Sequence, residues 1–152
     1  MIVGPLEQLL ADADLITPEG ITYAALILLG RPKSLGRFLA QAEVVFEYRS
    51  SEAPGPANQR DEYRQGFLTF FDKLWQTINL RNDKQHYLEG FVMHAIETFR
   101  EVSVREAILN AVSHRDYRHP GSVFVRQYPR RLEIVSPGGF PAGITPDNII
   151  DK

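Results

Sequence analysis

The sequence predicts an α+β domain in which helices pack on a mostly antiparallel sheet. Two observations carry this prediction. Apolar residues recur at helical spacing in two segments, 61–81 and 103–114. Between residues 122 and 135, apolar and polar side chains alternate with period two on both sides of Pro129, as in two antiparallel strands joined by a turn. The apolar stripe of a helix and the apolar face of such a sheet each need a partner, so we expect them to pack together.

The composition indicates a soluble globular protein. Of the 152 residues, 43% are hydrophobic and 24% charged, close to the average for folded domains. The chain contains no cysteine, which excludes disulfides and thiolate metal sites and suits a reducing compartment. With 17 basic and 19 acidic side chains the net charge is -2, so the chain as a whole is no polycation.

No segment resembles a membrane anchor or a secretion signal. The longest apolar run, 24–30, is far shorter than the ~20 residues that cross a bilayer. The first residues lack the basic flank and the cleavage site of a signal peptide. We therefore expect a cytoplasmic protein that does not interact with membranes.

Residues 1–50 read as a helix–strand segment. The pattern predicts a helix at 5–15, a turn at 17–20, a buried helix at 21–30 that ends at Gly30, a basic loop at 31–38 and a strand at 42–49. Residues 51–60 are rich in Ser, Pro, Ala and Gly without periodicity, which is typical of a flexible loop or a linker. The boundaries expected from this are 1–50, 51–60 and 61–152, although 1–152 could also form one continuous domain.

The second half of the chain carries the clearer periodicities. A helix is predicted over 61–81, a short strand within 86–96, and a second helix beginning between Phe99 and Ser103. Two strands and a loop rich in glycine and proline follow it. The second helix has an apolar stripe for the core, made of Val104, Ala107, Ile108, Ala111 and Val112.

The other side of this helix carries a polar row. Glu106, Asn110 and His114 recur every four residues and therefore share one face. The row could be a solvated face, with Ser103 as N-cap and Glu106 completing a capping box. Alternatively, Asn110 one turn from a carboxylate suits an oxygen ligand for Mg²⁺, and Glu106 could orient a water for attack on a phosphate. The remaining histidines show no metal-ligand spacing.

A glycine loop follows the last predicted strand. In "SPGGFPAGIT", Gly138, Gly139 and Gly143 permit close backbone approach to a ligand such as a phosphate. An ordinary Pro-Gly turn after a strand is the alternative. The loop matches neither the Walker A pattern nor the G-x-G-x-x-G fingerprint of dinucleotide-binding folds.

Arginines concentrate next to the polar helix. The segment from His114 to Arg131 has five arginines and a single acid, Asp116. The arginines are Arg115, Arg118, Arg126, Arg130 and Arg131. Such a cluster could contact the phosphates of a nucleotide or of nucleic acid. It could equally keep an exposed hairpin soluble.

The order of these elements resembles a known domain. An E-x-x-x-N-A helix (106–111), a two-stranded hairpin and a glycine loop (136–143) resemble the first half of the GHKL, or Bergerat-type, ATPase domain, an α/β sandwich. The sequence "REAILNAVSHRDY…RLEIVSPGGFPAGIT" is similar to the sequences of one branch of this superfamily. This branch comprises the RecG-related or predicted transcriptional regulator proteins of bacteria and archaea. In that branch a Schlafen AlbA-type domain precedes a divergent GHKL-type region. The resemblance covers roughly residues 15–150.

The resemblance implies ATP and Mg²⁺ as ligands. It makes Asn110 the magnesium ligand and Glu106 the general base, with His114, Arg115 and Asp116 matching the branch motif. Gly138, Gly139 and Gly143 would border the nucleotide, and Ser136 stands where the superfamily has an Asp that contacts adenine.

The function expected from the resemblance is that of a nucleotide-binding regulatory fragment of a DNA-associated protein. The ATP lid and the second glycine box of the superfamily would follow Lys152, so we expect no turnover by this chain alone. The alternative is a non-catalytic DNA- or protein-binding module that has lost nucleotide binding.

Overall fold

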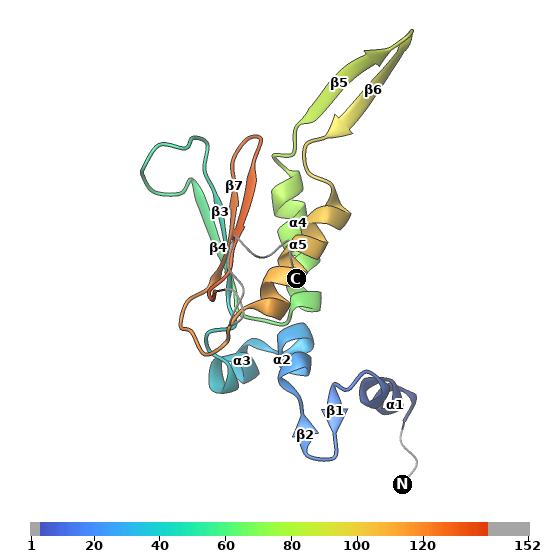
Figure 1. Ribbon diagram of the computed structural model, residues 1–152, viewed down its shortest axis with the longest axis vertical. Helices are drawn as coiled ribbons and strands as arrows, with labels where there is room; N and C mark the ends of the chain where they lie inside the picture. The colour runs from blue at the N-terminus through green and yellow to red at the C-terminus, as the bar shows by residue number, and fades with distance from the viewer. Residues whose placement is uncertain (1–3, 140–152) are drawn as a thin grey trace, which may run out of the picture.

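The computed structural model describes residues 4–139, and these form a four-stranded sheet with two helices packed on one face (Figure 1). The helices are α1 (Pro5–Asp12), α2 (Tyr23–Leu29), α3 (Pro32–Phe38), α4 (Phe67–Asn79) and α5 (Glu101–His114). The strands are β1 (Ile16–Thr17), β2 (Gly20–Ile21), β3 (Val44–Tyr48), β4 (Gln59–Tyr63), β5 (Lys84–Glu89), β6 (Val92–Glu97), β7 (Val123–Gln127) and β8 (Leu132–Val135). The expected α+β class is confirmed.

The main sheet has the order β4-β3-β7-β8. Its two outer pairs are antiparallel, whereas β3 and β7 run parallel, with Val44 opposite Val123. The sheet is therefore mostly antiparallel, as expected. β3 lies before the 51–60 segment, β4 begins within it at Gln59, and β7 lies after it, so strands from both sides of that segment share one sheet.

The core lies between the sheet and the pair α4–α5. From α4 the side chains of Phe67, Phe70, Phe71, Leu74 and Ile78 are buried. From α5 they are Val104, Ile108 and Val112, while Ala111 is partly buried and Ala107 is exposed. The expected stripe on α5 is thus correct except at Ala107. The inward residues of β3 and β7, such as Phe46 and Val125, complete the core.

The helix expected over 61–81 is shorter than its apolar pattern. Residues up to Tyr63 belong to strand β4, and α4 begins at Phe67. Gly66 is the N-cap of α4, and its amide donates to the carbonyl of Gly30 at 2.7 Å. A Cβ at Gly66 would stand 2.5 Å from the backbone nitrogen of Leu29. This close packing against α2 fixes the helix start, and sequence periodicity carries no trace of it.

Two expectations for the N-terminal segment are wrong. Residues 31–38 form helix α3 instead of a loop, because Pro32 suits the first helical position and Leu35 is buried. Helix α2 ends at Gly30 as expected, but of its residues only Ala25 is buried. Ile27 and Leu28 are half-buried against the core, whereas Tyr23 and Leu29 are exposed. Beyond α2, α1 and the β1–β2 ribbon lie apart from the sheet (Figure 1).

Residues 84–97 form a complete hairpin where a single short strand was expected. β5 and β6 pair over six rungs, from Lys84 opposite Glu97 to Glu89 opposite Val92. Gly90 supplies the positive φ that the two-residue turn requires. The hairpin projects away from the sheet and the helices (Figure 1).

The helix α5 begins at Glu101, inside the expected interval, with Arg100 as its N-cap. Ser103 is consequently in the first turn and is not the cap, so the capping box proposed for Ser103 and Glu106 does not form. Within residues 4–139, no helix combines the length and the apolar character needed to cross a bilayer.

We predict that Leu74→Ala lowers the free energy of unfolding by about 2–5 kcal/mol, because Leu74 is fully buried between the sheet and α5 and its removal leaves a cavity. Leu68→Ala on the same helix is the matched control. Leu68 is 57% exposed, so its truncation should change stability by at most about 0.5 kcal/mol. Urea denaturation followed by circular dichroism measures both, and equal losses would contradict the assigned core.

Candidate functional site

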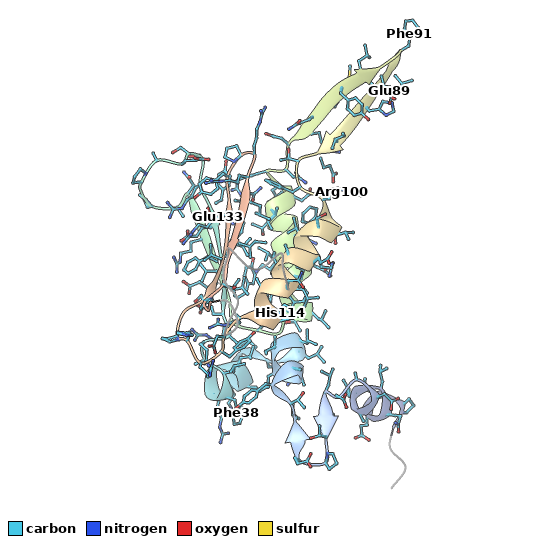
Figure 2. The ribbon with its side chains drawn as sticks, viewed as in Figure 1. Phe38, Glu89, Phe91, Arg100, His114 and Glu133 are labelled. Carbon is cyan, nitrogen blue, oxygen red and sulfur yellow. The ribbon has the colours of Figure 1, made fainter. Side chains whose placement is uncertain are left out.

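The polar row of α5 faces solvent. Glu106, Asn110 and His114 are all exposed, and the buried stripe of the helix lies on its other side. The row spans the second half of the helix, from its middle to its last residue. Figure 2 shows His114 and Arg100 at the two ends of α5. The three side chains are thus brought together on one accessible surface, as their spacing predicted.

An apolar recess adjoins this surface. It has a volume of about 300 Å³ and lies between the first half of α5 and strand β8, lined by Thr98, Phe99, Arg100, Ser103, Val104, Ala107, Leu132 and Ile134. Ser103, Ala107, Asn110 and His114 follow one another at helical spacing on this flank. The same side of the helix therefore offers small side chains beside the recess and polar ones farther along.

The glycine loop lies against the turn that follows α5. The amide of Asp116 donates to the carbonyl of Pro137 at 3.2 Å. Gly138 has a φ of 125°, and a Cβ there would lie 3.3 Å from the backbone nitrogen of Asp116. The glycine loop therefore contacts the turn that follows α5, although the sequence separates the loop from the E-x-x-x-N-A motif of that helix by more than twenty residues.

Asp116 and Arg118 form a bidentate pair in this turn. Arg118 Nε and Nη2 lie 2.9 and 2.8 Å from the two carboxylate oxygens, and the amide of Arg118 donates to Oδ1 at 2.9 Å. These hydrogen bonds hold the pKa of Asp116 well below its ordinary value of 3.8. The carboxylate is consequently fixed as an acceptor that shapes the turn and is no candidate general base.

Arg115 is a structural residue. It is buried, and its guanidinium donates to the carbonyls of Gln41 at 2.7 Å and His119 at 2.9 Å. The guanidinium also stacks on Tyr117, whose hydroxyl donates to the carbonyl of Val112. Burial raises the pKa of Tyr117 to about 12. Arg115 and Tyr117 of the HRDY motif therefore connect the end of α5 to the segment before β3. Because it is buried and hydrogen-bonded there, the Arg115 guanidinium is not accessible to a phosphate ligand.

Three of the remaining four arginines are paired with acids. Arg126 is on the sheet face opposite the helices, where it contacts Glu47 at 3.2 Å and Glu133 at 3.6 Å. Arg131 is 3.5 Å from Glu52. Arg118 and Arg130 are exposed, the former paired with Asp116. The arginines do not converge on one phosphate-sized site among the described residues.

Glu47 is the charged centre that the sequence reading missed. Its carboxylate is buried on the open face of the sheet and is held by Arg60 at 2.9 Å as well as by Arg126. The only available signal was a lone acid within the apolar run "VVFEY". This carboxylate neutralises arginine charge, including that of Arg126, which the sequence alone suggested as a phosphate contact.

The glycine loop is described only in part. Ser136, Gly138 and Gly139 are exposed beside the end of β8. Gly143 lies outside the described residues. Ser136 directly follows β8, so the strand leads the chain into the loop as the hairpin pattern indicated.

No family model and no curated protein sequence matches the chain. Among solved structures it is similar to the DIP2311 protein from Corynebacterium diphtheriae, a structural genomics target. The TM-score is 0.72 and the sequence identity 28%, over 95% of this chain. The chain spans 29% of the length of that protein. The similarity supports the fold described above and assigns no activity.

We predict that Arg118→Gln raises the pKa of Asp116 toward its ordinary value of 3.8 by removing the hydrogen bonds that stabilise the carboxylate. Because folding lowers this pKa, the ionised carboxylate stabilises the wild-type fold above its unfolded-state value. That contribution is lost as the pH falls through the folded-state pKa. Carboxyl-detected NMR titration measures the shift, with Arg130→Gln as control. A wild-type Asp116 that titrates at its ordinary value would contradict the assignment.

Proposed function

We propose that the polar face of α5 and the glycine loop bind an adenine nucleotide together with Mg²⁺. In this proposal the chain is the nucleotide-binding regulatory part of a DNA-associated protein related to the RecG-type, GHKL-like family. The nucleotide would lie along the exposed side of α5, where Glu106, Asn110 and His114 share one surface. The order of helix, hairpin and glycine loop supports the family relationship.

The contact between Gly138 and Asp116 carries the proposal. It brings the glycine loop to the end of α5 that also holds Asn110 and His114. Gly138 adopts a positive φ that other residues rarely adopt, and among residues 4–139 no heavy atom beyond its chain neighbours lies within 4 Å of a Cβ position at Gly139. The loop backbone is therefore close to the helix and open on its outer side, as approach to a phosphate requires.

The side chains present suit this ligand. The Asn110 amide oxygen and the Glu106 carboxylate are exposed one turn apart, and oxygen ligands are those that Mg²⁺ prefers. Mg²⁺ would neutralise phosphate charge when bound. Glu106 could hold and deprotonate a water for attack on a terminal phosphate. Ser136 offers a hydroxyl where the superfamily has a carboxylate, so adenine would be held by a neutral contact.

The arginines support a nucleic-acid role less well. Arg115 is buried, and Arg118, Arg126 and Arg131 are paired with acids in the described part of the chain. Binding to DNA requires Lys or Arg side chains that are free to neutralise phosphates, because the release of counterions from those phosphates drives the binding. For this reason we favour nucleotide binding at α5 over a DNA-binding module built on these arginines.

The proposal is tested by titrating the isotope-labelled chain with Mg²⁺-ATP and following its amide NMR signals. We expect shifts at Glu106, Asn110, His114 and Gly138. Asn110→Ala should weaken binding roughly tenfold or more, because it removes an oxygen ligand of the Mg²⁺ that neutralises the phosphate charge. Glu62→Gln, at an exposed position on β4, is the matched control and should bind as the wild type does.

Two outcomes would overturn the proposal. The first is a set of shifts confined to regions remote from α5 and the glycine loop. The second is an unchanged affinity in Asn110→Ala. Duplex DNA titrated at two salt concentrations tests the rival function, which requires an affinity that falls steeply as salt rises.

A further inference from the structure

The β5–β6 hairpin is exposed on both faces. Every residue of β5 is exposed, and so is every residue of β6 except His94, which is intermediate. Its large apolar side chains are well exposed, and they are Tyr87, Leu88, Phe91, Val92, Met93 and Ile96. Phe91 stands at the tip, farthest from the core (Figure 2). An isolated two-stranded hairpin is only marginally stable in water, so this one gains from a partner.

The two edges of the hairpin differ in charge. The β5 edge carries Lys84 and Glu89, whereas β6 is uncharged from Val92 to Ile96 when His94 is neutral. Natural sheets protect free edges with charges, prolines or bulges. Residues 92–96 have none of these, so β6 is the edge open to pairing.

The turn geometry shows which backbone groups of β6 are free. Among the turn residues φ is positive at Gly90 and not at Phe91, as in a type II′ turn. Glu89 and Val92, the pair that closes such a two-residue turn, exchange hydrogen bonds, and the pattern then alternates along the ladder. The N–H and C=O groups of Met93 and Ala95 therefore point away from β5.

We propose that β6 pairs antiparallel with β6 of a second copy of this chain, about a two-fold axis at His94. The free groups of Met93 then bond to those of Ala95 in the other copy, and the reverse. Val92 lies opposite Ile96 across the axis, and the two His94 residues form a non-hydrogen-bonded pair. All five uncharged residues are paired, and no like charges are opposed. The product is a four-stranded sheet with the order β5-β6-β6-β5.

A second copy fits this edge because the register is self-complementary. A two-fold axis perpendicular to a sheet keeps each face on the same side, so only residues of equal parity can lie opposite each other. Centring on His94 satisfies this condition and matches the free hydrogen-bonding groups of β6. His94 stacks on Tyr87 at 5.2 Å, on one face of the hairpin, and does not obstruct the edge.

The interface is small, which fixes the expected strength. The hairpin from Lys84 to Glu97 is much shorter than the roughly 20–30 residues that each partner contributes to a standard interface. We therefore expect a monomer–dimer equilibrium that depends on concentration instead of an obligate dimer.

Sedimentation velocity over a concentration series tests the proposal on the whole chain. The average mass should rise from 17.3 kDa toward twice that value. Ala95→Pro should abolish the rise, because it removes an N–H that points away from β5 and so leaves the hairpin itself intact. His86→Pro is the matched control, since His86 is opposite Ala95 on the same rung, and it should dimerise like the wild type.

A cysteine pair provides the second measurement. The chain has no cysteine, so His94→Cys introduces one thiol at the axis. A non-hydrogen-bonded pair places its Cα atoms about 4.5 Å apart, within disulfide range. Oxidation should give a covalent dimer with His94→Cys and none with Tyr87→Cys, which occupies the same rung on β5. A wild type that stays monomeric throughout, or dimerisation of Ala95→Pro, would overturn the proposal.

Discussion

The burial of one stripe of α5 is the constraint on which the rest of this structure depends. Val104, Ile108 and Val112 contact the core beneath the sheet, and together they fix the rotation of the helix about its axis. Once that rotation is fixed, Glu106, Asn110 and His114 must face outward, because they lie on the opposite side at the same spacing. The accessible polar surface is thus a consequence of core packing.

The turn after α5 holds the helix in place along its axis. Arg115 reaches back to the carbonyl of Gln41, before β3, and the Asp116 amide reaches the loop after β8. These hydrogen bonds join the helix end to both the start and the end of the main sheet. The HRDY motif is therefore explained by architecture, and its conformation also determines where the glycine loop lies relative to the helix.

Charge is distributed differently over the sheet and the hairpin. On the open face of the sheet, Glu47 is buried among Arg60 and Arg126, so positive charge is neutralised within the fold. From Val92 to Ile96, the free edge of β6 carries no charge when His94 is neutral. A sheet face whose charges are paired within the fold does not promote association with other chains. An uncharged strand edge with free backbone N–H and C=O groups does promote it. The surface suited to association is therefore the hairpin, away from the candidate nucleotide face.

The sequence by itself determined the features that rest on local periodicity. The helix α5, the β7–β8 hairpin, the polar row with Asn110 and the glycine loop were all predictable, because helical and strand patterns repeat over a few residues. Nucleotide binding stays a prediction from that row and loop. Only the tertiary structure decided the parallel pairing of β3 with β7, the start of α4 directly after Gly66 and the burial of Arg115. Each of these depends on a contact with backbone that is distant in the sequence, and short-range residue patterns do not show which distant segments come together.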